Sequence, residues 1–293
     1  MVNTIELKLS LIVTSNNRGK ELNRFIDSIK FQDVNKFQVI LINQGEINVE
    51  LRKLFSKYNW TIVDIGKQVP LSYARNIGLK YIKGEFIGFP DDDCWYSYNF
   101  INDIILELDK LNGSEALCVS VFDPILQVPY GDRPRNIIKV LNFSNVIKLP
   151  VSVGIFIKAK MVSDFKMQFN EKLGAGTFYG GGEETAFLCK VLMYKKKVIY
   201  NGFLTVYHEV DNYNEISIEK VVKYSRGYGY IIGSILRNHK FMVLPSVILF
   251  LSKSFGGLLL RVYSKKHFLV YYNRIKYFFS GVFDAFKDRD PAF

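Results

Sequence analysis

The chain has 293 residues, of which 48% are hydrophobic, so a sizeable core can form and intrinsic disorder is excluded as its general state. Its three cysteines are an odd number without a CxxC pair, which excludes a disulfide framework and favours a reducing, cytoplasmic setting. The formal net charge is +11, and such a balance favours anionic partners.

The first 90 residues alternate between short apolar runs, typical of buried strands, and amphipathic patterns, typical of helices. Strands are predicted, in chain order, at 8–14, 37–42, 60–65 and 85–89. Helices are predicted at about 22–29, 48–58 and 71–83, the first on the apolar stripe Leu22, Phe25, Ile26 and Ile29. Strand–helix alternation at this spacing predicts right-handed βαβ units and an α/β fold with a mostly parallel sheet.

The next segment continues this pattern as far as residue 214, where we place the end of a globular domain, 1–214. Helices are predicted at about 98–112 and 185–194, and strands at 116–122, 151–157 and 197–207. Residues 123–149 show no clear period and contain three prolines, so they are predicted to form a long loop. The N-terminus lacks a basic region and a small-residue cleavage site, and no signal peptide is expected.

Residues 215–293 have long helical patterns and form a predicted helical extension, rich in aromatic residues, with 13 Lys+Arg against 5 Asp+Glu. This combination predicts contact with an anionic membrane surface. No nucleic-acid-binding signature accompanies the charge, and nucleic acid is not an expected partner. The most apolar window, 241–251, has about half the roughly 20 residues of a spanning helix, and Pro245 and Lys253 interrupt it. We therefore predict an amphipathic element in the membrane interface; the alternative is a helical cap packed on the domain.

Polar residues stand directly after three of the predicted strands, at 15–18, 43–46 and 91–93. Sheets of this type bind ligands at the carboxyl ends of their strands. Asp91 and Asp93 can aim at one point with Asp92 turned away, and carboxylate oxygens suit Mg²⁺ or Mn²⁺. An exposed acidic turn is the structural alternative, but the position after the fourth strand favours a metal site.

Two further features suggest chemistry. GGGEET brings Glu183 and Glu184 to the start of a helix, where one carboxylate could act as a general base, although glutamate is ordinary in a first helical turn. His208 ends the last predicted strand and could be a third metal ligand or a structural residue. Arg18, Lys67 and Arg75 could meet phosphates or a base.

Four segments resemble the family 2 glycosyltransferases with the GT-A fold: KLSLIVTSNNRGKELNRFIDSIKFQ, FQVILINQGE, LSYARNIGLKYIKGEFIGFPDDD and FNEKLGAGTFYGGGEETAFL. The resemblance covers roughly residues 8–210. The order of ARN, an apolar strand, DxD and a GxGEE-type helix start is specific, although each part alone is not. The tail, with KYSRGYGYIIGSIL and YYNRIKYFFSG, is similar to C-terminal helices of bacterial members that build surface polysaccharides.

The resemblance implies roles for the acidic residues. Asp91 and Asp93 match the DxD motif, which holds a divalent metal, Mn²⁺ or Mg²⁺, on the diphosphate of a nucleotide-sugar donor. Glu184 matches the base that activates the acceptor hydroxyl, and Glu183 could exchange roles with it. His208 lies where many members have a histidine near the metal.

The resemblance also implies donor contacts. Ser15 and Arg18 match the nucleotide-binding loop after the first strand, and Arg75 matches the arginine near the pyrophosphate. Asn43 and Gln44 stand where the family usually has an acid pair, which leaves recognition of the base open.

These features together predict a metal-dependent, inverting glycosyltransferase, peripheral at the inner face of the cell membrane, with a saccharide or lipid-linked saccharide acceptor. Trp95 and Tyr96 either stack on the acceptor sugar or belong to the core or rim. Asp92 either touches the donor ribose or faces water. The alternatives are a nucleotidyltransferase, and a non-catalytic membrane-associated or saccharide-binding module.

Overall fold

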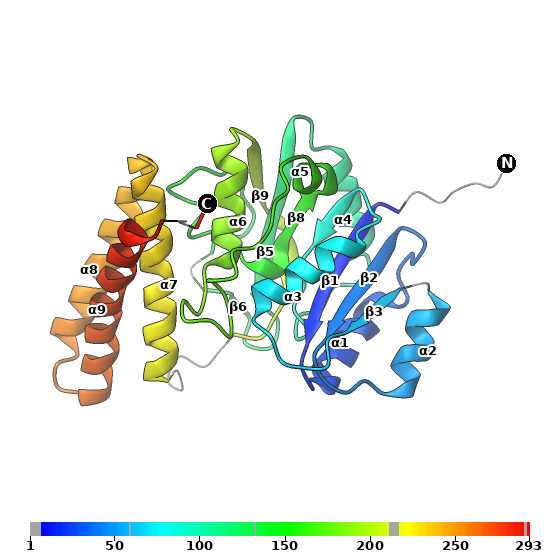
Figure 1. Cartoon of the computed structure of the whole chain (residues 1–293), viewed down its shortest axis with the longest axis horizontal. Helices are drawn as coiled ribbons and strands as arrows, with labels where there is room; N and C mark the ends of the chain where they lie inside the picture. The colour runs from blue at the N-terminus through cyan, green and yellow to red at the C-terminus, as the bar shows by residue number, and fades with distance from the viewer. Residues whose placement is uncertain (1–6, 59, 132, 211–216, 290–291) are drawn as a thin grey trace. The chain divides into compact units, whose positions relative to one another are not determined.

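The structure is a computed structural model that describes residues 7–58, 60–131, 133–210, 217–289 and 292–293 (Figure 1). By their contacts, the described residues group into two compact units. The first lies within 1–140, 149–168 and 195–210, and the second within 141–148, 169–194 and 211–293. The predicted boundary between 214 and 215 lies outside the described residues, as does the N-terminal segment 1–6.

The strands of the described chain form one nine-stranded sheet in the first unit, in the order β3-β2-β1-β4-β8-β5-β9-β7, with β6 paired to β5. Their bounds are β1 Leu9–Ser15, β2 Phe37–Asn43, β3 Thr61–Asp64, β4 Phe86–Gly88, β5 Ser114–Asp123, β6 Val128–Pro129, β7 Ile138–Val140, β8 Ile155–Lys158 and β9 Lys197–Tyr207. The strands predicted from apolar runs are therefore confirmed, except that the one predicted at 151–157 begins only at Ile155, after a 3-10 turn at Ser152–Gly154. The predicted long loop at 123–149 contains two short strands, β6 and β7, which the sequence pattern missed.

The sheet is mixed, which corrects the prediction of a mostly parallel one. β3, β2, β1 and β4 are parallel neighbours, as the βαβ pattern predicts. β8 is antiparallel to both β4 and β5, whereas β9 is parallel to β5. A parallel return needs a crossover, usually a helix, and the described residues between β5 and β8 contain no α-helix. β8 therefore enters the sheet in the opposite direction.

Five helices accompany the sheet in the first unit: α1 Gly19–Ile29, α2 Val49–Lys57, α3 Leu71–Gly78, α4 Phe100–Asp109 and α5 Ala159–Asp164. All four residues of the stripe predicted for the first helix are buried, because this face packs into the main core. The helix predicted at 71–83 ends earlier, with α3 followed by one 3-10 turn at Leu79–Tyr81. The short α5 has no counterpart in the predicted elements.

The second unit contains α6 Glu183–Met193, α7 Ile218–Arg237, α8 Leu244–Leu260 and α9 Lys265–Lys287. α9 lies beside both α7 and α8 (Figure 1). The glycine-rich segment before α6 meets α7 so closely that a Cβ on Gly227 would lie 2.6 Å from the Gly181 carbonyl oxygen. This contact explains why residues 169–194 group with the C-terminal helices, although the predicted division placed them in 1–214.

The apolar stretch around α8 is longer than the sequence analysis predicted from the 241–251 window. Residues 241–260 are long and apolar enough to cross a membrane by length and composition alone. Pro245 does not interrupt the helix, because it lies in the first turn of α8, where a missing N–H leaves no hydrogen bond unmade. Lys253 lies within the continuous helix.

Candidate active site

The acidic turn follows β4 and is fastened to strands on both sides. Asp91 forms a parallel bridge with Thr14 of β1. Trp95 pairs with Tyr207 at the end of β9, and both of the backbone N–H···O distances are 2.9 Å. The turn therefore lies at the carboxyl ends of the strands, as predicted, and its position is set by neighbours that are far away in the sequence.

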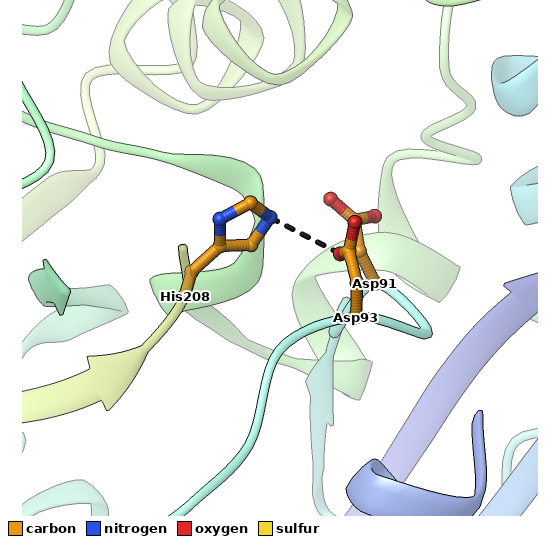
Figure 2. Close-up of side chains that lie close together, drawn as sticks. All are labelled: Asp91, Asp93 and His208. Carbon is orange, nitrogen blue, oxygen red and sulfur yellow. Dashed lines mark ion pairs between the residues drawn. The ribbon is translucent and has the colours of Figure 1, made fainter. Parts of the chain in front are cut away.

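Asp91, Asp93 and His208 form a cluster that could hold a metal ion, because one ligand atom from each lies within 4.8 Å of the others. His208 Nε2 is 3.1 Å from Asp93 Oδ1. Figure 2 shows the imidazole at the end of β9 pointing toward the two carboxylates of the turn. Two carboxylate oxygens and one imidazole nitrogen form a donor set that fits Mn²⁺ or Mg²⁺.

The electrostatics of this cluster favour an ionised carboxylate. Burial by itself would raise the pKa of Asp93, but the hydrogen bond and charge of His208, together with Arg18, outweigh it and lower that pKa. Burial would conversely lower the pKa of His208, but Asp93 outweighs it and raises that pKa. Asp93 is therefore held as an anion, which is the protonation state that binds a cation.

Asp92 has a different environment. It is buried, and its Oδ1 accepts a hydrogen bond of 3.0 Å from Arg18 Nη1. Burial raises the pKa of Asp92 to about 6, against the opposing effects of the Ser15 hydroxyl and Arg18. The interpretation in which Asp92 faces water is therefore wrong, because its carboxylate points toward Ser15 and Arg18. Contact with a donor stays a prediction.

The two predicted phosphate-binding arginines lie directly against the acids. Arg18 Nη2 donates to Asp93 Oδ2 at 2.8 Å, so Arg18 spans two carboxylates. Arg75, from α3, donates from Nη2 to Asp91 Oδ1 at 2.9 Å and is buried. The structure thus brings together cations and anions that the sequence spreads over more than 70 positions. Lys67 is exposed in the segment that follows β3.

The amide pair after β2 is engaged in hydrogen bonds of the fold. Asn43 Nδ2 donates to Asp64 Oδ1 at 2.7 Å, and Gln44 Oε1 accepts the Val69 N–H at 2.7 Å. Arg52 also binds Asp64 through two hydrogen bonds, and Arg52 first, then Asn43, lowers the pKa of Asp64. Asp64 therefore places a carboxylate next to Asn43, the position at which the resembled family usually has an acid. Sequence reasoning missed it, although its position at the end of β3 was a usable signal.

The two aromatic residues after the acids have different environments. Tyr96 is 4% exposed and packs in the core, with ring centroids 4.4 Å from Phe100 and 5.7 Å from Phe25. The prediction that Tyr96 stacks on a sugar is therefore wrong. Trp95 is half-buried, its ring centroid is 6.0 Å from that of Tyr207, and its role as an acceptor contact stays a prediction.

Arg24 is a site residue that no sequence motif indicated. Its Nη2 donates to the Asp93 carbonyl at 2.9 Å, its guanidinium lies 4.1 Å from the centre of the Trp95 ring, and it forms an ion pair with Glu209. Arg24 thus ties α1 to the turn that carries Asp93 and to the residue after His208. We assign it a positioning role.

Replacing Arg24 by lysine is expected to lower kcat/KM of the reaction at this site about 10-fold, because a single ammonium group cannot make all three contacts of the guanidinium. The Trp95 fluorescence should shift as well, which a change confined to stability would not produce. Arg135→Lys is the matched control, since Arg135 also stacks on a ring, that of Phe122, at 4.2 Å. Equal kinetics and fluorescence in the two variants would rule out the positioning role.

Glu183 and Glu184 begin α6 in the second unit, within two residues of the predicted helix start. Gly182 caps the helix with a φ of 93°, a left-handed conformation that favours glycine, and a Cβ there would lie 2.9 Å from the Ile231 side chain. Glu183 is buried, whereas Glu184 is half-exposed. Glu184 therefore has the more accessible carboxylate of the pair.

The chain resembles proteins of known family. The family model described as glycosyl transferase family 2 matches residues 10–165. The chain is 28% identical over 116 residues to "Glycosyltransferase GlyA" of Streptococcus pneumoniae, a match that covers 39% of this chain and 17% of that protein. It is 25% identical over 178 residues to "Teichoic acid poly(glycerol phosphate) polymerase" of Staphylococcus epidermidis, covering 57% of this chain and 24% of that protein. The chain thus spans less than a quarter of the length of each of these relatives.

Solved structures show the same fold at low sequence identity. S. aureus TarS 1–349 in complex with UDP-GlcNAc has a TM-score of 0.65 and 17% identity, and the match covers 94% of this chain and 82% of that one. The mannosyltransferase PcManGT of Pyrobaculum calidifontis, in complex with GDP-Man and Mn²⁺, has a TM-score of 0.59 and 13% identity, covering 97% and 88%. The GT-A fold is thereby confirmed. Because the family model spans more than half of its residues, the chain belongs to glycosyl transferase family 2.

Proposed function

We propose that the protein transfers a sugar from a nucleoside-diphosphate sugar to a hydroxyl of a saccharide or lipid-linked saccharide during the synthesis of a bacterial surface polysaccharide. The observation that carries the proposal is the cluster of Asp91, Asp93 and His208, with Arg18 and Arg75 paired to the same acidic turn. Anionic and cationic groups alternate there, as a site for a metal-bound diphosphate requires. Family membership and the nucleotide-sugars bound by TarS and PcManGT add support.

Of the two arginines at the acidic turn, Arg18 would bind the donor phosphates, whereas the buried Arg75 would position Asp91. Arg18 is the more accessible of the two, with 44% of its side chain exposed, so it can turn from the carboxylates toward an incoming phosphate. Arg75 is buried and holds Asp91 in place. Asp92 pairs with Arg18 and is itself hydrogen-bonded to Ser15. Asp91, Asp93 and His208 would hold Mn²⁺ or Mg²⁺, which when bound would stabilise the charge of the leaving diphosphate.

Glu184 would act as the general base. Its carboxylate takes the proton of the acceptor hydroxyl while the hydroxyl oxygen forms a bond to the anomeric carbon, and the bond from that carbon to the phosphate oxygen breaks with its electron pair on the diphosphate. Attack from the face opposite the leaving group inverts the anomeric centre. The accessible carboxylate of Glu184 supports its choice over the buried Glu183.

The proposed location is the inner face of the cell membrane, with the protein attached peripherally. The excess of 13 basic over 5 acidic residues in 215–293 supports it, because anionic lipids attract such a segment. The Staphylococcus epidermidis relative is named as a teichoic acid polymerase, which is consistent with an acceptor used in surface polymer synthesis.

A thermal unfolding panel tests the proposal. One nucleoside-diphosphate sugar with Mn²⁺ is expected to stabilise the protein by about 2.7 kcal/mol at a hundred times its Kd, and neither component alone should do so fully. Incubation of that donor with saccharide acceptors should then release the nucleoside diphosphate. Stabilisation by a nucleoside triphosphate with a sugar phosphate would indicate a nucleotidyltransferase instead. Stabilisation by saccharides alone would indicate a non-catalytic binding module.

A further inference from the structure

The outward face of α8 carries six exposed large apolar side chains, with the exposed Ser252 among them. The six are Leu244, Ile248, Leu249, Phe255, Leu259 and Leu260. Ile248 is 64% exposed, and Leu259 and Leu260 are 75% and 77% exposed. At 3.6 residues per turn, this set falls on one half of the helix circumference. The turn that follows adds exposed Val262 and Tyr263. A surface of this size exceeds the scattered apolar residues that are normal on a soluble protein.

The inward face of α8 has the opposite character at its most buried positions. Ser246 and Ser254 are fully buried, and their hydroxyls donate to the carbonyls of Ser144 and Phe250 at 2.6 and 2.7 Å. Gly257 packs so closely on α9 that a Cβ there would lie 2.3 Å from the Tyr271 ring. On a surface helix of a water-soluble protein, the large apolar residues face inward, toward the core. Phe250 also packs inward, on the rings of Tyr228 and Phe278. Small residues at the most buried positions, with large apolar residues outside, are nevertheless the pattern of helices that meet lipid.

The charge of the same region identifies the kind of partner. Between Lys220 and Phe283 the sequence contains eleven Lys and Arg residues and no Asp or Glu. Lys240 precedes the exposed apolar set, and Arg261, Lys265 and Lys266 follow it. A second copy of this chain would bring the same positive charge and repel the first. An anionic bilayer offers hydrocarbon to the exposed apolar side chains and negatively charged headgroups to the neighbouring lysines and arginines.

The packing of α8 indicates whether this helix lies along the bilayer surface or crosses the bilayer. The Arg274 guanidinium of α9 lies 4.8 Å from the centre of the Phe250 ring, near the middle of α8. If α8 crossed the bilayer, Arg274 would be carried to the depth where an arginine is most costly. Lys253 lies at the edge of the exposed half of the helix, from which its ammonium can reach the headgroups.

We propose that the outward face of α8 and the 261–263 turn insert lengthwise into the interface of an anionic phospholipid bilayer, without crossing it. This inference rests on the proposed function at one point: the bilayer is where the protein would meet a lipid-linked acceptor. It does not depend on the chemistry at Asp91, Asp93 and His208, so it can be tested separately.

The test is flotation of the 293-residue chain with vesicles of phosphatidylcholine, with or without phosphatidylglycerol. Wild-type protein is expected to float with the anionic vesicles and to be released by alkaline carbonate. The double variant Ile248→Asp/Leu259→Asp should bind at least about 100-fold more weakly, because it loses two inserted side chains and gains repulsion. Lys265→Ala/Lys266→Ala should bind anionic vesicles about 30-fold more weakly.

The control variant is Ile125→Asp/Ile138→Asp, which makes the same change at two equally exposed isoleucines of the first unit and should float like wild type. Unchanged thermal unfolding and donor binding would show that each variant is folded. Equal flotation of the α8 variant and the control would overturn the proposal. Resistance to carbonate would overturn the surface orientation, and a lipid-free dimer abolished by Ile248→Asp/Leu259→Asp would assign the surface to a second copy. Flotation as expected from a protein without transferase activity would contradict the proposed function alone.

Discussion

Asp93→Asn is expected to lower kcat/KM for sugar transfer about 1,000-fold, because the amide removes the anion that His208 and Arg18 hold in place. Asparagine has nearly the same shape as aspartate, so the turn between β4 and Trp95 should persist. Titration calorimetry with Mn²⁺ should show a large loss of metal binding, and donor binding should lose its response to metal. Steady-state kinetics supply the rate.

Asp27→Asn is the matched control for this change. Asp27 lies on α1 in the same unit, is exposed, and pairs with the nearby Lys30, so its variant should keep normal activity and metal binding. An Asp93→Asn protein that binds donor with unchanged affinity and an unchanged response to metal would remove the metal site from this cluster. Loss of activity in both variants would point to a general effect on stability.

Glu184→Gln is expected to retain donor binding but to lose about 1,000-fold in kcat, because the amide cannot accept the proton of the acceptor hydroxyl. Donor binding is measured by calorimetry with Mn²⁺ present, and kcat by release of the nucleoside diphosphate at saturating acceptor. Separating binding from turnover distinguishes a missing base from a misplaced donor.

The control for this variant is Glu219→Gln. Glu219 also lies in the first turn of a helix of the second unit, at the start of α7, so the electrostatic effect on the helix is similar. It should leave kcat unchanged. Near-normal turnover of Glu184→Gln, together with an inactive Glu183→Gln, would assign the base to Glu183 instead.

Local sequence patterns predicted most of the elements because each depends on neighbours within a few residues. The stripe from Leu22 to Ile29 faces the core as its spacing requires. The acids at 91–93 follow the fourth strand and lie with Ser15 and Asn43 at one edge of the sheet, as the rule for parallel strands predicts. The same reasoning failed for β8, whose direction depends on the path of the chain between two distant strands.

Side-chain partners were less predictable, since they depend on contacts across the fold. No local pattern distinguishes Trp95 from Tyr96, yet one is half-buried beside Arg24 and the other lies in the core. Arg24 itself sits on the polar face of α1, where most arginines are solvated. The same holds for α8. Its composition indicated an apolar segment, but it did not predict which side chains would face inward.

The sequence by itself determined the alternating α/β pattern, the acidic turn after β4, the helix that begins with Glu183 and Glu184, and the concentration of positive charge near the C-terminus. Each is set by chain-local periodicity or composition. Only the tertiary structure brought His208 to Asp93, paired Arg18 with two carboxylates, buried Tyr96 and turned the leucines of α8 outward. These arrangements depend on which distant segments pack together, and the free energy of that packing is a property of the whole fold rather than of any short segment.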